Sequence, residues 1–244
     1  MLPARMSLML VLALALVGCK TGADTGSQKL ALIDETDAVA TGSIPRTVFE
    51  LEPGVVQWYA ERGAALPLND RLPYCHGYGC EFKTPIAVGP DEEAQVAAIF
   101  AQNRGSPEAE RHAVDLADQW WEKLAAPQLG GPPDIRGSDM AHAHMPGQTD
   151  CLDEATNTTT LLAWLERKGY LKYHHVQRPE SRGMFLYAHA TAVMTDRITG
   201  IDWVADSWMR DSGDPIDVMP LETWFSLAYV DPVPRLHLVH YGGF

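Results

Sequence analysis

The spacing of apolar residues predicts helices in the first half of the folded region. Apolar positions recur with helical spacing over residues 91–102 and again from Ser106 to Leu124. The second segment carries a clear start signal, because Ser106 can cap the helix, Pro107 suits its first turn and acidic residues follow. A further helix is expected to begin at Cys151 and to end at Gly169 after basic residues.

After residue 169 the apolar period changes to two, which is typical of strands. Strands are expected over residues 171–177, 184–195 and 200–208, with a four-residue turn at 196–199 and a short final strand over 236–240. Gly and Pro predict loops over residues 129–137 and over most of the chain after residue 211. Helices followed by strands favour an α+β fold in which the helix at Cys151 packs against an antiparallel sheet.

The N-terminus has the features of an export signal. Arg5 precedes an apolar run over residues 8–17, which is too short to span a bilayer as a permanent helix. The run ends in Leu-Val-Gly-Cys, which resembles the lipobox of bacterial lipoproteins. This resemblance implies that residues 1–18 are a signal peptide and that Cys19 carries the lipid. An ordinary secretory signal or a short membrane anchor is the alternative.

The rest of the chain divides into a tether and one domain. Residues 19–47 are small and polar, which is typical of a flexible tether, and residues 48–244 suffice for a single domain with a sizeable core. In having Lys20 and not Asp after the lipid-bearing cysteine, the chain resembles lipoproteins that are sorted to the outer membrane. The expected location is therefore the bacterial cell envelope, facing the periplasm. The net charge of −13 and the lack of a basic block argue against a nucleic-acid partner.

The four cysteines need separate explanations, because an exported protein meets conditions that favour disulfides. Cys75 and Cys80 flank two glycines that allow a tight turn, so a disulfide is expected between them. The competing interpretation is a metal site made by Cys75, His76 and Cys80, but a fourth ligand at a suitable spacing is missing and no metal is expected. Cys151 is then left unpaired, and it is either a buried structural thiol or a reactive one.

A thiol at a helix start is a candidate nucleophile, because the helix dipole is expected to lower its pKa. Such a thiol needs a histidine to take its proton and a carboxylate to orient the imidazole. If a four-residue turn pairs Thr195 with Gly200, His189 falls directly opposite Asp206 on one face of the hairpin. Asp202 on the same face is the reserve candidate.

At these residues the chain resembles the bacterial transglutaminase-like cysteine peptidases and their papain-like relatives. The resemblance rests on Asp-Cys-Leu-Asp at 150–153, His-Ala at 189–190 and the segment Trp-Val-Ala-Asp-Ser-Trp at 203–208. It implies a papain/transglutaminase-like fold and a catalytic triad of Cys151, His189 and Asp206. The chain departs from the family pattern at Thr149, where members commonly have Gly before the acid-Cys pair.

The partner for the oxyanion is less clearly marked. Papain-like enzymes use a Gln farther upstream, whereas the nearest Gln here is Gln148, only three residues before Cys151. The backbone N–H of Cys151 is the first candidate donor, with Gln148 or an indole N–H of Trp120 or Trp121 as second donors.

These observations predict a thiol hydrolase that cleaves an amide bond in a protein or peptide substrate without a cofactor. Transfer of the acyl group to an amine is the second choice. A non-catalytic lipoprotein that uses the same fold as a binding or scaffolding module is the alternative from a different class. Acetyl transfer like that of arylamine acetyltransferases would need a cofactor-binding segment, and none is recognisable.

Overall fold

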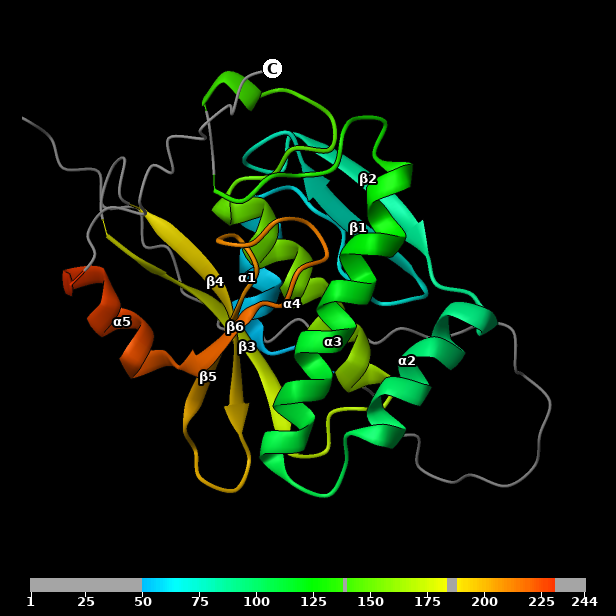
Figure 1. Ribbon diagram of the computed structural model, residues 1–244, viewed down its shortest axis with the longest axis vertical. Coiled ribbons are helices and arrows are strands. Elements are labelled where there is room, and N and C mark those ends of the chain that lie inside the picture. The colour runs from blue at the N-terminus through cyan, green and yellow to red at the C-terminus, as the bar shows by residue number, and fades with distance from the viewer. Residues whose placement is uncertain (1–49, 138–139, 184–187, 231–244) are drawn as a thin grey trace, which may run out of the picture. The chain divides into compact units, whose positions relative to one another are not determined.

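The computed structural model describes residues 50–137, 140–183 and 188–230 (Figure 1). The chain divides into two units, Met1–Val48 and Phe49–Phe244, and all described residues belong to the second. The expectations of a signal peptide, a lipidated Cys19, a tether and a strand over 236–240 lie outside the described residues. No helix of the described part is long and apolar enough to cross a membrane.

The described residues form an α+β fold, as the apolar pattern predicts. The helices are α1 (Pro53–Glu61), α2 (Pro90–Gln102), α3 (Pro107–Ala125), α4 (Cys151–Arg167) and α5 (Leu221–Val230), with short 3₁₀ turns η1 (Ala126–Gln128) and η2 (Met140–His142). The strands are β1 (Arg71–His76), β2 (Phe82–Ala87), β3 (His174–Arg182), β4 (His189–Asp196), β5 (Asp202–Asp206) and β6 (Asp217–Pro220). β1 and β2 form a hairpin, and β3-β4-β5-β6 form an antiparallel sheet in that order.

Local capping explains where α3 and α4 begin. Ser106 Oγ accepts a hydrogen bond from Ala109 N at 3.1 Å, and Pro107 occupies the first turn of α3, which confirms the predicted start. In α4, the Asp150 side chain accepts bonds from Leu152 N at 3.0 Å and Asp153 N at 2.9 Å. Asp153 reaches back to the Asp150 N–H, which completes a capping box around Cys151.

Helix α4 lies between the four-stranded sheet and the β1–β2 hairpin (Figure 1). Its middle is buried all round, which is expected of a helix covered on several sides. Thr156, Thr159 and Thr160 satisfy their buried hydroxyls by donating to the carbonyls four residues earlier. The catalytic candidates on α4 and on the sheet therefore stand on rigid elements.

The predicted register of the β4–β5 hairpin is wrong by two residues. Thr195 pairs with Asp202 and Ala192 with Ala205, so the extended register sets Asp206 opposite Thr191 instead of His189. The turn is longer than expected because Asp196 Oδ1 accepts bonds from Ile198 N at 2.8 Å and Thr199 N at 3.1 Å. An even shift keeps every side chain on its face, so His189 and Asp206 still share one.

Three further expectations need correction. β3 begins at His174 because the Glu110 carboxylate takes the N–H groups of Lys172 and Tyr173, and it continues past a bulge to Arg182. The chain after residue 211 forms β6 and α5 as well as loops, because short apolar segments there pack on β5. The predicted strand over 184–195 begins at His189 in the described part, and residues 184–187 lie outside it.

Candidate active site

Cys151 is the first residue of α4, and its thiol is free and half-buried. The Sγ atom lies 3.8 Å from the carbonyl oxygen of Ala188, and the Ala190 backbone also hydrogen-bonds it. The sulfur therefore rests against the backbone on both sides of His189. Among the described residues no acceptor takes the Cys151 N–H, which leaves this donor open at the helix start.

His189 and Asp206 form a buried pair. His189 Nε2 lies 2.7 Å from Asp206 Oδ2, and each residue is 4% exposed. Within the described part, His189 Nδ1 and Asp206 Oδ1 are buried without a hydrogen-bond partner. The carboxylate thus holds one nitrogen of the imidazole and leaves the other uncommitted.

Two indole rings enclose the imidazole. The ring of Trp208 lies 4.5 Å from that of His189, measured between centroids, and the ring of Trp224 lies 5.3 Å away. Trp224 Nε1 also donates to Asp206 Oδ2 at 2.7 Å. From the residue pattern Trp224 is expected to be an ordinary core aromatic, because a single indole carries no local signal that its N–H has a carboxylate partner.

The structure thus brings two of the three candidates into contact and sets the third beside them. Among the described contacts, the Cys151 thiol bonds backbone groups and makes no hydrogen bond to His189. Catalytic hydrogen bonds are often long or misaligned before substrate binds, so this geometry is compatible with a resting site. Asp202, the reserve candidate, accepts a bond from the Thr195 hydroxyl at 2.5 Å near the far end of the hairpin.

The expected lowering of the thiol pKa is wrong for the resting site. Burial raises the pKa of Cys151 to about 12, and the negative charge of Asp150 adds to the increase. The backbone bond from Ala190 acts in the opposite direction. Cys151 is therefore a neutral thiol at rest, and its proton must leave as the sulfur attacks.

Two of the three proposed second oxyanion donors, Gln148 and Trp120, donate to other groups in the structure. Gln148 Nε2 donates to the carbonyls of Pro132 at 3.2 Å and Pro133 at 3.1 Å, which uses both of its hydrogens. Trp120 Nε1 donates to Gln95 Oε1 on α2 at 3.2 Å. Trp121 Nε1 has no hydrogen-bond partner among the described residues, but the side chain is fully buried against the Tyr74 ring. The Cys151 N–H is therefore the predicted donor that lies at the nucleophile itself without a described acceptor.

Loops from three parts of the chain are joined around the start of α4. Gly131 comes so close to the next loop that a Cβ atom there would lie 1.7 Å from the Pro146 oxygen. Asp134 Oδ1 accepts a bond from Thr149 N at 2.8 Å, and the Asp134 carbonyl accepts one from Ser212 N at 3.3 Å. The segment 129–137 thus forms a loop, as predicted, and fixes the approach to Cys151.

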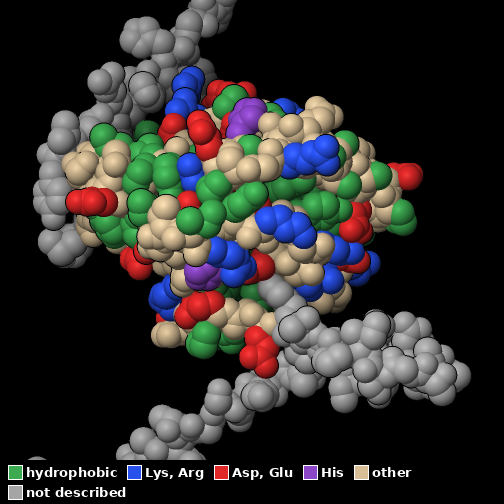
Figure 2. Space-filling view, turned by 90° about the horizontal axis from the view of Figure 1, so that it is seen from below, with side chains coloured by type: hydrophobic (Ala, Val, Ile, Leu, Met, Phe, Trp, Pro, Cys, Tyr) green, Lys and Arg blue, Asp and Glu red, His purple; other side chains and the backbone are tan. Residues whose placement is uncertain are grey.

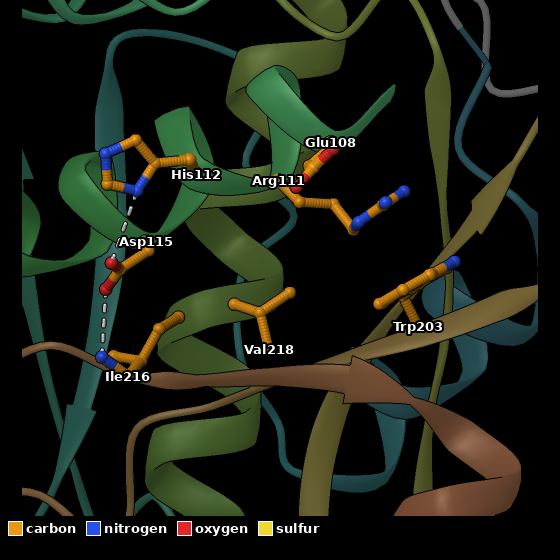
Figure 3. Close-up of a pocket in the computed structure, with 7 residues that line it drawn as sticks. All are labelled: Glu108, Arg111, His112, Asp115, Trp203, Ile216 and Val218. Atoms are coloured by element: carbon orange, nitrogen blue, oxygen red, sulfur yellow. Dashed lines mark hydrogen bonds and ion pairs between the residues drawn. The ribbon is translucent and has the colours of Figure 1, made fainter. Parts of the chain in front are cut away.

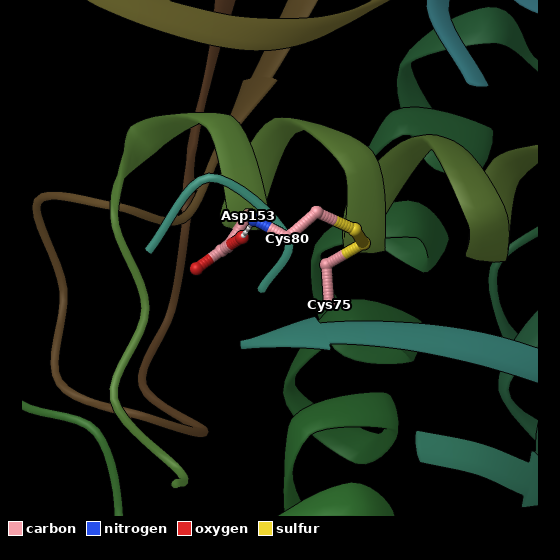
Figure 4. A group of neighbouring side chains, drawn as sticks. All are labelled: Cys75, Cys80 and Asp153. Atoms are coloured by element: carbon pink, nitrogen blue, oxygen red, sulfur yellow. Dashed lines mark hydrogen bonds between the residues drawn. A yellow bond between two sulfur atoms is a disulfide. The ribbon is translucent and has the colours of Figure 1, made fainter. Parts of the chain in front are cut away.

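The Cys75–Cys80 disulfide is present, and its loop is docked on the start of α4 (Figure 4). Asp153 is fully buried and accepts bonds from Tyr78 N at 2.8 Å and Cys80 N at 2.5 Å. Asp150 Oδ2 accepts a further bond from Gly79 N at 3.0 Å. Both acids that flank Cys151 are therefore fixed by this loop.

The same contacts disfavour the alternative metal site. His76 Nε2 lies 2.9 Å from the Thr84 hydroxyl, and its Nδ1 accepts a bond from Gly147 N at 3.1 Å. Asp153 lies near the two sulfurs, but its oxygens are occupied by backbone N–H groups (Figure 4). The residues present do not fit a metal ion while the disulfide is formed.

A group of buried carboxylates lies beneath the site and was not foreseen. Asp118 and Glu122 are one turn apart on α3, and both interact electrostatically with Glu154 on α4. Glu122 also interacts electrostatically with Asp134. Burial and the charge of Glu154 raise the pKa of Asp118 and of Asp134 to about 8. Within the described residues none of the four forms an ion pair. The helical spacing 114-118-122, which places both acids on a buried stripe of α3, was the available signal.

A separate pocket of about 390 Å³ lies between α3 and the β5–β6 end of the sheet (Figure 3). It is lined by Glu108, Arg111, His112, Asp115, Trp203, Ile216 and Val218. The Arg111 guanidinium stacks on the Trp203 ring at 3.7 Å, so the aromatic wall is already covered. On the face shown in Figure 2, Lys and Arg side chains lie scattered between acidic ones and form no continuous basic surface.

Comparison with protein-family models, with curated proteins and with solved structures finds no match to this chain. The likeness to transglutaminase-like peptidases therefore rests on the residues described above.

Proposed function

We propose that the protein is a thiol hydrolase that cleaves an amide bond of a peptide or protein through Cys151, His189 and Asp206. The observation that carries the proposal is the buried His189–Asp206 pair, with its second imidazole nitrogen free, beside an unpaired thiol at a helix start. Cys151, His189 and Asp206 lie on α4, β4 and β5, and the fold brings them together from distant parts of the sequence.

The chemistry follows from the uncommitted groups. His189 Nδ1 takes the proton of Cys151 as the sulfur attacks the carbonyl carbon, because the neutral thiol is a poor nucleophile. Asp206 accepts the Nε2–H bond and stabilises the imidazolium that forms. The Cys151 N–H stabilises the oxyanion, the amine leaves with the proton from His189, and water hydrolyses the thioester. An amine in place of water would give acyl transfer.

The test is the rate at which iodoacetamide alkylates Cys151 at pH 7. We expect His189→Ala to lower this rate by at least tenfold, because a positioned base typically contributes about 10²–10⁴-fold. His112→Ala is the matched control, since its side chain is 60% exposed on α3, and it should leave the rate unchanged. Cys151→Ala identifies the labelled residue. Equal rates in wild type and His189→Ala would contradict the proposal.

A second candidate is a binding module that keeps the fold without catalysis. It is favoured by the absence of a described Cys151–His189 bond and by the raised pKa of the thiol. In that case His189 and Asp206 are a structural pair, and the alkylation rate does not depend on either.

We further propose that the mature protein is attached by lipid on Cys19 to the bacterial envelope, facing the periplasm. The apolar run over residues 8–17 and the Leu-Val-Gly-Cys segment support this address. Metabolic labelling with an alkyne-bearing palmitate tests it, because Cys19→Ala should abolish incorporation. Incorporation that persists in Cys19→Ala would exclude the lipobox assignment.

A further inference from the structure

Two hydrogen bonds converge on one oxygen of Asp206. His189 Nε2 and Trp224 Nε1 each lie 2.7 Å from Oδ2, while Oδ1 is buried without a partner in the described part. The hydrogen bonds of this carboxylate to described residues are therefore one from the imidazole and one from the indole. Arg182 and Arg210 also attract the Asp206 carboxylate electrostatically and Glu154 repels it, but Trp224 is the one described hydrogen-bond donor to it besides His189.

Trp224 also excludes water from the pair. It is 1% exposed, and its ring lies 5.3 Å from the His189 ring at an angle of 45°. A hydrogen bond in such a dry environment is stronger than one in contact with water. The indole thus supplies a donor to the carboxylate and a wall to the imidazole at once.

The indole is itself held by the neighbouring strand. Arg182 Nη1 donates to the Trp224 carbonyl, and its guanidinium carbon lies 4.0 Å above the Trp224 ring. Arg182 is the cross-strand partner of His189 between β3 and β4. The contacts run from His189 through Asp206 and Trp224 to Arg182, which is again beside His189.

We propose that Trp224 is a positioning residue that holds Asp206 in the orientation and ionised state that His189 requires, an inference that rests on the proposed thiol chemistry. An N–H donor stabilises a carboxylate anion over its protonated form. Without this donor, the negative charge of Asp206 is less dispersed, so the carboxylate interacts more strongly with the Nε2–H of His189 and stabilises the imidazolium. A more stable imidazolium moves the acidic limb of the pH–rate profile to higher pH, because the reaction needs the neutral imidazole.

The test is the pH profile of Cys151 alkylation by iodoacetamide in wild type and Trp224→Phe. Phe keeps an aromatic ring and removes the N–H, so loss of a charged hydrogen bond should shift the acidic limb upward by about one pH unit. The matched control is Trp164→Phe, which removes the indole bond to Asp70 Oδ1 at 2.9 Å, about 20 Å farther along α4. It should leave the limb in place.

A structural effect of the substitution is separated by a double variant. If Trp224 acts through Asp206, Trp224→Phe should cause no further shift in an Asp206→Ala background. A limb that coincides with wild type in the folded Trp224→Phe variant would overturn the inference, and so would an undiminished shift in the Asp206→Ala background.

A spectroscopic measurement separates this inference from the proposed function. The Nε1–H resonance of Trp224 should move upfield in Asp206→Ala, because the carboxylate acceptor is gone. If alkylation proves independent of His189 but the resonance moves, the function is wrong and the contact is real. If the resonance does not move, Trp224 does not hold Asp206.

Discussion

The buried carboxylates beneath α4 make the stability of this protein depend on pH in an unusual direction. Asp118 is fully buried on α3, and neither of its oxygens has a hydrogen-bond partner by geometry among the described residues. Burial, followed by the negative charge of Glu154, raises its pKa from 3.8 to about 8. The folded protein therefore binds a proton at Asp118 more tightly than the unfolded chain does.

The sign of the effect follows from linkage. The stabilising contribution is complete below the unfolded pKa near 4 and is lost as the pH rises through about 8. Each unit by which the pKa is raised corresponds to about 1.4 kcal/mol. Even a rise of one unit in the pKa of Asp118 would lower the Tm at pH 9 by roughly 3 to 5 °C for a domain of this size.

Asp118→Asn removes the charge with little change in shape. We expect its Tm to exceed that of wild type by at least roughly 3 °C at pH 9 and to differ little at pH 5, measured by circular dichroism. Glu108→Gln, an exposed acid on the same helix, is the control and should give a pH-independent difference above pH 6. Parallel Tm curves for Asp118→Asn and wild type from pH 5 to 9 would refute the reasoning.

Two further predictions concern the elements that frame the nucleophile. In the double variant Cys75→Ser, Cys80→Ser, the free energy of unfolding in urea should fall by about 2 kcal/mol, because the disulfide closes a six-residue loop. Alkylation of Cys151 should also slow, because the loop that binds Asp150 and Asp153 is released. An unchanged alkylation rate would show that the loop does not position these acids. Gly131→Ala should lower the Tm, because its Cβ would meet the Pro146 oxygen at 1.7 Å, whereas Gly89→Ala, whose Cβ meets only the flexible end of Glu92, should lower it much less; equal losses would contradict the close approach.

Features set by neighbouring residues could be predicted from the sequence. The Ser106 cap and Pro107 define the start of α3 within one turn, and Asp150 does the same for α4. The disulfide follows from five residues of separation and two glycines. The change of apolar period after residue 169 indicates the sheet, although not the ends of its strands.

Features set by distant contacts could not be predicted. The β4–β5 register depends on how the Asp196 side chain closes its own turn, and only the even size of the error kept His189 and Asp206 on one face. Gln148 bonds two proline carbonyls from a loop fifteen residues away. The pKa of Cys151 depends first on burial beneath other elements and then on the charges of the adjacent Asp150 and the more distant Asp206, so the helix dipole alone was a poor guide.

Formation of a thioester at Cys151 tests the central claim most directly. Wild-type protein is incubated with p-nitrophenyl acetate, and the peptide that contains Cys151 is examined by mass spectrometry. The account predicts one acetyl group on Cys151 in wild type and at least tenfold slower acetylation in His189→Ala, with His112→Ala unchanged. Acetylation of Cys151 at the same rate in wild type and His189→Ala, or none in either, would contradict it.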